Sequence, residues 1–381
     1  MSKVNDLIKK LCPKGVEYKN IKDLCLENFW VMPSTPIYQN EGIPYITSKN
    51  IRNGIVMFDD AKYITEEDYK SISSNRPITE NDVLISMIGT IGEVGIVRKE
   101  DLPFYGQNMY LLRLNTNLIN IKYFYHYFTS DMVRKKLLGE KNNGNQGYLK
   151  TKNIELLKVP VPPLEVQQEI VKILDKFGEL EVELEVELEA RKSQYEFWRG
   201  KLLDKTYKKM KLQDVLSIKN GKDYKHLESG NIPVYGSGGV MTYVSDYVYN
   251  KPTVLIPRKG SLGNVFYVDT PFWNVDTIYY TEIDETKVIP KYIYYFIQNK
   301  HLDRLNIAGG VPSMTQTTLN KLDIDIPPIE EQKRIVNVLD KFDKLINNIS
   351  VGLPAEIELR RKQYEYYRNK LLSFEELSVS E

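Results

Sequence analysis

The sequence PPLEVQQEIVKILDKF at residues 162–177 returns as PPIEEQKRIVNVLDKF at residues 327–342, 165 positions later. A second pair follows in the same order: QYEFWRGKLL at 194–203 returns as QYEYYRNKLL at 363–372, 169 positions later. Self-similarity of this kind is typical of chains built from repeated structural units. The chain therefore consists of two copies of one design, and each copy has a variable half ahead of its repeated segments.

Both repeated segments have the apolar spacing of an amphipathic helix. Apolar residues recur three and four positions apart, and the Pro-Pro pairs suit a helix start, where a missing N–H costs nothing. Two such helices in one chain can bury their apolar stripes against each other, although a stripe packed on its own domain is the alternative. The residues expected in these stripes are Ile170, Leu174, Phe177, Leu180, Leu184, Leu188, Tyr195, Trp198, Ile335, Leu339, Phe342, Tyr364 and Tyr367.

The two copies differ between their helical segments. The first carries LEVELEVEL at residues 180–188, a four-residue unit in tandem, and the second carries Val351-Gly-Leu-Pro354. The first alternates with period two, as a strand does, but Leu and Glu favour helices and both flanks are helical, so we expect a continuous helix. Glycine and proline should bend or break the second helix.

The variable half of each copy has the pattern of a mixed α/β domain. Residues 82–97 and 252–268 each predict a strand, a Gly-[Thr/Ser]-[Ile/Leu]-Gly loop and a second strand, and helical stretches follow both. We expect an α+β protein in which two tandem α/β domains are joined by two long antiparallel coiled-coil helices in a pseudo-two-fold internal repeat. The expected boundaries are 1–160 and 205–325 for the domains, and 161–204 and 326–381 for the helical segments.

Loops in both variable halves carry side chains suited to nucleic acid. Recognition of DNA uses Lys and Arg for phosphates and hydrogen-bonding side chains for base edges, and neighbouring glycines let the backbone approach closely. A Gly-Thr-x-Gly loop alone is most simply a tight turn, but its recurrence, basic in one copy and neutral in the other, favours binding. The candidate DNA-binding residues are Lys49, Asn50, Arg52, Thr90, Gln107, Asn108, Asn143, Asn145, Gln146, Lys150, Arg258, Lys259, Ser261, Asn264, Asn274, Ser313, Thr315 and Gln316.

Overall composition neither requires nor excludes a nucleic-acid partner. With 52 Lys and Arg against 51 Asp and Glu, the net charge is +1, so a DNA surface must concentrate its positive charge locally. Two cysteines and three scattered histidines are too few for a disulfide framework or a predicted metal site. We see no secretory signal at the start and no apolar run of membrane-spanning length, which predicts a reduced, cytoplasmic protein without membrane contact.

The sequence contains no recognisable catalytic motif. It has no G-x-x-x-x-G-K-[ST] loop for a nucleotide and no G-x-S-x-G elbow for a nucleophile. Its two Pro-Pro pairs have neither the leading Asn or Asp nor the trailing aromatic residue with which an amino-methyltransferase holds its target nitrogen. We therefore predict no catalytic residue and no metal ligand in this chain.

These repeated motifs resemble a known family, the specificity subunits of type I restriction-modification systems. The resemblance covers essentially the whole chain and rests on the Pro-Pro-[Leu/Ile]-Glu-x-Gln-x-x-Ile-Val starts, the Leu-Asp-Lys-Phe segments and the ending Arg360-Arg-Lys-Gln-Tyr-Glu-Tyr-Tyr-Arg368. The stretches Gly352-Leu-Pro-Ala-Glu-Ile-Glu358 and Leu11-Cys-Pro-Lys-Gly-Val-Glu-Tyr18 are similar to the family as well.

The resemblance implies a role for each part of the chain and for its partner subunits. Each variable half would recognise one half of a bipartite double-stranded DNA target, and the helices would set the spacer and dock two modification (methyltransferase) subunits. Restriction subunits would complete an ATP-dependent nuclease, and S-adenosylmethionine, ATP and magnesium would belong to these partners, with no cofactor in this chain. The four-residue repeats would set the spacer, since one added turn of about 6 Å matches nearly two base pairs of about 3.4 Å each.

Two alternative functions belong to other classes. A stand-alone DNA-modifying or DNA-cleaving enzyme could lack a recognisable motif, and metal-dependent nicking by the isolated chain would favour it. A helical assembly scaffold would use the variable halves to bind protein. Exchanging those halves between relatives would then leave DNA preference unchanged.

Overall fold

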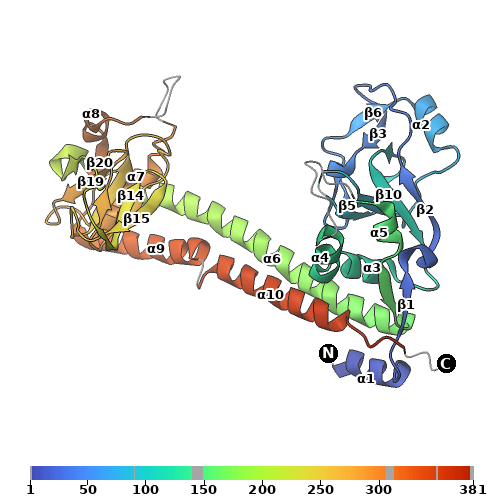
Figure 1. Cartoon of the computed structure of the whole chain (residues 1–381). Helices are drawn as coiled ribbons and strands as arrows, with labels where there is room; N and C mark the ends of the chain where they lie inside the picture. The colour runs from blue at the N-terminus through green and yellow to red at the C-terminus, as the bar shows by residue number, and fades with distance from the viewer. Residues whose placement is uncertain (1, 90, 140–148, 305–312, 349–350, 378–381) are drawn as a thin grey trace. The chain divides into compact units, whose positions relative to one another are not determined.

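The computed structural model divides the chain into two compact units: unit 1, Met1–Glu183 with Glu358–Glu381, and unit 2, Leu184–Ile357 (Figure 1). It describes residues 2–89, 91–139, 149–304, 313–348 and 351–377. Each unit contains one variable half together with helical segments from both sequence copies.

Unit 1 is a mixed α/β domain. Its elements ahead of the long helix are α1 (Ser2–Leu11), β1 (Glu17–Asn20), η1 (Ile21–Leu24), β2 (Cys25–Val31), β3 (Ile43–Ile46), η2 (Ser48–Asn50), β4 (Ile51–Arg52), β5 (Ile55–Val56), β6 (Lys62–Ile64), α2 (Glu66–Ser73), β7 (Val83–Ser86), β8 (Val94–Ile96), η3 (Lys99–Asp101), β9 (Tyr105–Gly106), β10 (Met109–Leu114), α3 (Ile121–Phe128), α4 (Asp131–Gly139), α5 (Thr151–Glu155) and β11 (Lys158–Val161). Helix α6 (Leu164–Leu203) follows and continues into unit 2.

Unit 2 repeats this order in a shorter form. Its elements after α6 are β12 (Lys208–Lys211), η4 (Leu212–Asp214), β13 (Leu216–Lys219), β14 (Ser229–Gly236), β15 (Gly239–Val244), β16 (Thr253–Pro257), β17 (Phe266–Val268), β18 (Trp273–Asn274), β19 (Ile278–Ile283), α7 (Pro290–Asn299), α8 (Gln316–Asn320), β20 (Asp323–Ile326) and α9 (Ile329–Asn347). Helix α10 (Leu353–Leu371) begins in unit 2 and ends in unit 1.

The sheets of the two units have the same topology. A four-stranded sheet has the order β2-β10-β7-β8 in unit 1 and β13-β19-β16-β17 in unit 2. A three-stranded sheet, β6-β3-β9 or β15-β14-β18, pairs one antiparallel and one parallel neighbour with its central strand in both units. The central strands β7 and β16 are buried along their whole length, as expected for strands covered on both faces. The predicted internal repeat of two α/β domains is confirmed.

A buried glutamine locks the start of each repeated helix to its own domain. In unit 1, Gln167 Oε1 accepts from the Asn120 N–H at 2.7 Å, and its Nε2 donates to the carbonyls of Leu118 and Pro162. In unit 2, Gln332 makes the corresponding hydrogen bonds to the Ile289 N–H and to the carbonyls of Lys287 and Pro327. The Gln of the repeated Glu-x-Gln motif therefore satisfies three backbone groups that the fold has removed from water.

Truncation of either glutamine should cost stability without touching any exposed surface. We expect Gln167→Ala or Gln332→Ala to lower the free energy of unfolding by about 2–4 kcal/mol, because three buried backbone groups lose their partner and a cavity remains. The neighbouring Gln168 is exposed, so Gln168→Ala is a matched control that should stay within about 0.5 kcal/mol of the parent. Denaturant unfolding measures the free energy of all three variants. A loss for Gln168→Ala equal to that for Gln167→Ala would contradict the assignment.

The repeated helices pair in antiparallel fashion within each unit. In unit 1, the Phe177 ring stacks on Tyr367 with centroids 5.4 Å apart, and one turn further along α6 the Glu181 carboxylate accepts from Arg361 on α10. In unit 2, Tyr195 on α6 contacts Phe342 on α9, and Lys205, just after α6, pairs with Glu331. Residue numbers rise on one helix as they fall on the other, so the predicted antiparallel arrangement is confirmed in both units.

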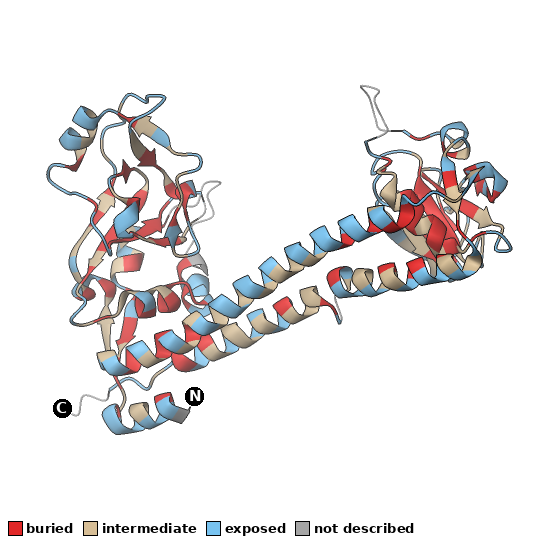
Figure 2. Cartoon of the chain, turned by 180° about the vertical axis from the view of Figure 1, so that it is seen from behind, coloured by how far each residue is buried: buried red, intermediate tan, exposed pale blue. Residues whose placement is uncertain are grey.

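Each stripe packs on its own domain as well as on the opposing helix. Ile170 and Leu174 belong to the unit 1 core, which also buries Leu371 and Leu372 from the end of α10. Ile335 and Leu339 belong in the same way to the unit 2 core, with Tyr195 from α6. Figure 2 shows buried residues at the two ends of α6 and mainly exposed ones along its middle. Both interpretations of the stripes, helix on helix and helix on domain, therefore hold.

The middle of the helical segments follows most of the predictions. The Leu-Glu-Val-Glu stretch lies within the continuous helix α6, and the second copy is interrupted between Asn347 and Leu353, as its glycine and proline predicted. A Cβ on Gly352 would lie 2.5 Å from the carbonyl oxygen of Leu345, so only glycine fits that bend. Leu184 and Leu188 are half-buried, whereas Leu180 is exposed.

Trp198 corrects the predicted second stripe. It is 36% exposed, and the buried residues are Tyr195, Arg199 and Leu202. Arg199 lies four residues after Tyr195 and its guanidinium is 5.1 Å from the Tyr195 ring centroid. Residues three and four positions after Tyr195 lie on neighbouring sides of α6. The structure buries the second of them, Arg199, and leaves Trp198 exposed.

Candidate nucleic-acid interface

The predicted loop of unit 2 is held at one edge of the four-stranded sheet. It connects β16 and β17, and the N–H groups of Arg258 and Lys259 both donate to the carbonyl of Thr277, at 2.9 and 3.3 Å. Gly260 has a φ of 79°, a conformation that favours glycine. Asn264 closes the loop by donating to the carbonyl of Ser237 at 3.1 Å. Lys259, Ser261 and Asn264 are exposed on this framework.

The segment 313–316 lies directly beside this loop. The Met314 N–H donates to the carbonyl of Arg258 at 2.8 Å, and Ser313 forms a bridge with Lys259. The Thr315 hydroxyl caps α8 by accepting from the Thr318 N–H. Gln316 donates to the Asn220 side chain at 3.2 Å. The structure therefore brings together all of the predicted unit 2 residues except Asn274.

Aromatic and basic groups share this edge. The Arg258 guanidinium lies 6.0 Å from the centroid of the Tyr279 ring. Burial raises the pKa of Tyr279, against the opposing effect of the Arg258 charge, so the ring remains neutral at physiological pH. A half-buried Arg supported by a neutral ring and an exposed Lys form the kind of local positive surface that phosphates require.

Unit 1 gathers its candidates around the corresponding edge. Lys49 and Arg52 are exposed on the segment after β3, whose Ser48 hydroxyl donates to the Asn108 carbonyl at 2.6 Å. Gln107 accepts from the Tyr45 hydroxyl at 3.3 Å. Exposed Lys150 follows Leu149, whose N–H donates to the carbonyl of Met87 at 3.2 Å, and the Met87 N–H donates to Asn108.

Two candidates are corrected by their burial. Asn50 is buried, with its Nδ2 donating to the Met57 carbonyl and its Oδ1 accepting from the Thr47 N–H, so it stabilises the turn around η2. Asn274 is 0% exposed, and its Nδ2 donates to the Ile278 carbonyl. Both side chains are used by the fold because they satisfy backbone groups at tight connections. Thr90, Asn143, Asn145 and Gln146 lie outside the described residues.

Sequence reasoning missed the residues that hold the unit 2 loops together. Thr277 accepts from two loop N–H groups through its carbonyl, and its hydroxyl accepts from the Ser237 N–H at 3.3 Å. Asn220 directly follows β13 and Ser237 directly follows β14, and both contact the loops. Thr277 follows the buried strand β18 closely in sequence, and that position is the signal that could have identified it.

A second feature repeats on the helices. In Tyr-Glu-[Phe/Tyr]-[Trp/Tyr]-Arg, the Tyr and Arg point inward, and Phe197 and Tyr366 are each 61% exposed. Lys201 and Lys370 lie over these two exposed rings, at 5.7 and 5.9 Å from the centroids. We call Phe197, Trp198 and Lys201 the unit 2 aromatic patch, and Tyr366, Tyr367 and Lys370 the unit 1 aromatic patch. Exposed aromatic residues of this kind are typical of protein interfaces.

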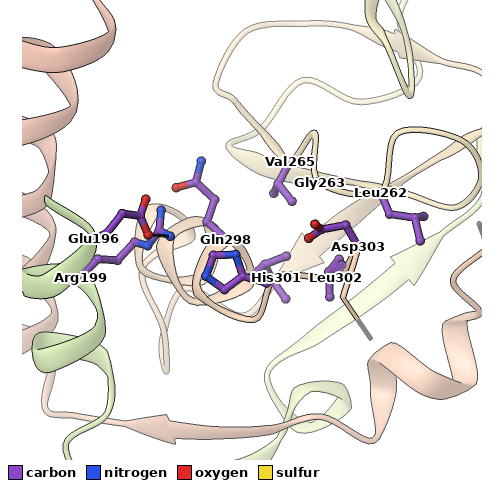
Figure 3. A pocket seen from close by; sticks show the side chains of 10 residues that line it. Glu196, Arg199, Leu262, Gly263, Val265, Gln298, His301, Leu302 and Asp303 are labelled. Carbon is purple, nitrogen blue, oxygen red and sulfur yellow. Dashed lines mark hydrogen bonds and ion pairs between the residues drawn. The ribbon is translucent and has the colours of Figure 1, made fainter. Parts of the chain in front are cut away.

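A polar cavity of about 260 Å³ lies beside Arg199 in unit 2 (Figure 3). Its lining joins Glu196 and Arg199 on α6 to Leu262 and Gly263 of the β16–β17 loop and to His301 after α7. Arg199 pairs with Glu196, and its buried Nε has no hydrogen-bond partner among the described residues. The cavity thus connects the helix that carries the aromatic patch with the loop that carries Arg258.

Neither metal-binding nor membrane-spanning features stand out in the part of the chain that the structure describes. Groups of three or more His, Cys, Asp or Glu residues placed to hold a metal ion are absent there. Across the same residues, helices long and apolar enough to cross a bilayer are also absent.

Comparison with known proteins decides the family. The model of the type I restriction modification DNA specificity domain matches residues 13–191 and again residues 204–359. The chain belongs to the type I restriction-modification specificity family. A putative type I restriction enzyme specificity subunit of Haemophilus influenzae is 34% identical over 287 residues, which cover 67% of this chain and 73% of the relative. The EcoR124I/EcoR124II specificity subunit of Escherichia coli is 33% identical over 297 residues, covering 67% and 71%.

Solved structures of family members share the fold. The S subunit of the M. genitalium type I restriction-modification system covers 94% of this chain and 96% of its own, with a TM-score of 0.58 and 17% identity. A chain from a structure of type I system assembly and conformational transition aligns with a TM-score of 0.64 and 15% identity, over 94% and 98% of the two chains. This specificity subunit therefore shares its fold with solved family members along nearly its whole length.

Proposed function

We propose that each unit recognises one half of a bipartite double-stranded DNA sequence through the loops at the edge of its four-stranded sheet. The observation that carries this proposal is a shared framework with different side chains. The Leu149 N–H donates to Met87 in unit 1, and the Met314 N–H donates to Arg258 at the corresponding place in unit 2. At the next position the same backbone arrangement presents the exposed apolar residue Ile88 in unit 1 and the exposed cation Lys259 in unit 2, as two different half-sites would require.

We further propose that the chain supplies specificity while its partners supply catalysis. Phe197 and Tyr366 are equally exposed, and each lies beside a second aromatic residue and under a lysine in the repeated Tyr-Glu-[Phe/Tyr]-[Trp/Tyr]-Arg segments, so each patch would dock one modification subunit. Restriction subunits would join this assembly, and S-adenosylmethionine, ATP and magnesium would be bound by the partners. The site of action would be the cytoplasm, where DNA and these cofactors occur together.

Replacement of one exposed cation tests the DNA interface. We expect Lys259→Ala, in complex with the modification subunits, to weaken binding of the target duplex about tenfold and to lower the slope of log affinity against log salt by about one, because one phosphate contact is lost. Lys251 is also exposed in unit 2 but lies outside the loops, so Lys251→Ala is the control for charge alone. Fluorescence anisotropy over a salt series measures both.

Two further measurements separate the proposal from its alternatives, a test of sequence preference and a test of DNA cleavage. The parent complex should prefer one bipartite sequence over random DNA, and that sequence is found by mapping methylated bases in cells that carry the system. A complex without any sequence preference would refute a specificity function. Nicking of DNA by the isolated chain with a divalent metal would instead favour a stand-alone enzyme.

A further inference from the structure

An exposed apolar strand lies next to the β16–β17 loop of unit 2, which carries Arg258, Lys259 and Asn264. Strand β15 is one of the two edge strands of its three-stranded sheet, and Val240, Met241 and Tyr243 on it are all exposed. Met241 is 58% exposed, although its sulfur lies only 2.6 Å from the position that a Cβ on Gly236 would take. The Met241 side chain is thus laid across the start of the β14–β15 turn, where glycine leaves room for it.

The turn at residues 237–238, which leads into β15 and Met241, is part of the proposed DNA surface. The Ser237 carbonyl accepts from Asn264, and the Ser237 hydroxyl oxygen lies 3.2 Å from the Cβ position of Gly260 in the Arg258–Asn264 loop. In front of the turn, none of the described residues has an atom within 4 Å of the Cβ position of Gly238. The apolar strand and the basic loop therefore meet at this turn, and the space beside Gly238 is open among the described residues.

The internal repeat shows which part of this surface is framework. Strand β14 pairs in parallel with β18 just as β3 pairs with β9 in unit 1, so the sheet itself is common to both units. The connection out of this central strand differs. In unit 1 it runs from 47 to 61 and presents Lys49 and Arg52, whereas in unit 2 it is a tight turn that leads directly to Met241. Elements that vary on a constant framework are the ones able to recognise different bases.

The chemistry of base edges selects the target of an apolar side chain. In the major groove, donors and acceptors distinguish most base pairs, and the C5-methyl group of thymine is the apolar feature. We propose that Met241 contacts a thymine methyl group in the half-site recognised by unit 2. This inference rests on the proposed DNA-specificity function. Its occupant is the duplex rather than another protein, because the apolar strand meets the loop that carries Arg258 and Lys259.

Uracil substitution removes that methyl group without changing any hydrogen bond. The holo-complex with its modification subunits is titrated with the target duplex, in which each thymine is replaced in turn by uracil. We expect one position in one half-site at which uracil weakens binding about fourfold, the effect of removing one buried methyl group. In a Met241→Ala complex, thymine and uracil at that position should bind equally, and Met241→Leu should restore most of the discrimination.

The controls separate this inference from the proposed function. Leu26→Ala truncates an exposed apolar residue in unit 1 and should leave the uracil effect unchanged. If the complex prefers its bipartite site but no uracil position depends on Met241, or the half-site contains no thymine, Met241 does not contact a methyl group. If Met241→Ala leaves DNA binding intact but weakens assembly with the partner subunits, the strand is a protein contact instead. Loss of all sequence preference in the parent complex would overturn the proposed function itself.

Discussion

Insertion of one further Leu-Glu-Val-Glu unit after Leu188 should keep both half-sites of the DNA target and lengthen the unspecified spacer between them. Helix α6 is continuous through this stretch, so four residues add about one turn, or ~6 Å. That length is close to the rise of two base pairs. Methylation at the original sequence should fall to background, and the new sequence should have a spacer longer by one or two base pairs. Methylome mapping of cells that carry the variant measures this result.

A two-residue insertion at the same place is the matched control. Two residues rotate Leu188 by about 200° relative to Tyr195, so these two residues, which both pack on the unit 2 core, can no longer do so together. We expect this variant to lose stable assembly rather than to acquire a new spacer. The four-residue insertion should fold, since Val182 and Val186 along this stretch are already exposed. A map with altered bases and an unaltered spacer would contradict the prediction.

Removal of the unit 2 aromatic patch should abolish one of the two sites for modification subunits and leave the other intact. We expect Phe197→Ala with Trp198→Ala to weaken binding of one modification subunit by at least about 100-fold, because large aromatic anchors dominate the energetics of such interfaces. Both side chains are exposed, so folding should be preserved. Native mass spectrometry should then detect complexes with one modification subunit in place of two, and methylation of the target should fall in parallel.

Two further variants make this prediction specific. Tyr366→Ala with Tyr367→Ala alters the equivalent patch and should also leave one modification subunit bound, although Tyr367 stacks on Phe177 and a modest loss of stability is expected there. Val186→Ala changes an equally exposed apolar residue on α6 outside the patch and should retain both subunits. Retention of two subunits by the Phe197 and Trp198 variant would exclude the patch as a docking site.

The sequence was sufficient to predict the helices but not which of their faces are buried. Repetition of the Pro-Pro-led segments predicted two copies, and Gly352 with Pro354 predicted the interruption between α9 and α10, because these residue types have narrow backbone requirements. Helical periodicity alone could not choose between Trp198 and Arg199 as the buried neighbour of Tyr195. That choice depends on the ring and carboxylate that surround the guanidinium, which only the folded helix brings together.

Only part of the candidate interface could be predicted, because local sequence does not show which polar side chains the fold buries. Lys259, Asn264 and Thr315 could be identified because glycine and polar residues cluster around them in sequence. Asn50 and Asn274 have the same chemistry, yet their amides satisfy backbone groups inside the fold. Thr277 and Met241 were missed, since their importance arises from contacts across strands that local sequence does not encode.

The final turn of α10 has a consequence for synthesis on the ribosome. Leu371 and Leu372 are buried in the core of unit 1, whose other members come mainly from the first 174 residues. Unit 2 is contiguous in sequence and can complete its core before Leu371 and Leu372 are synthesised. Unit 1, although most of it is made first, cannot complete its core until these two leucines are made, so a chain released before them should expose an unfinished apolar surface to chaperones and proteases.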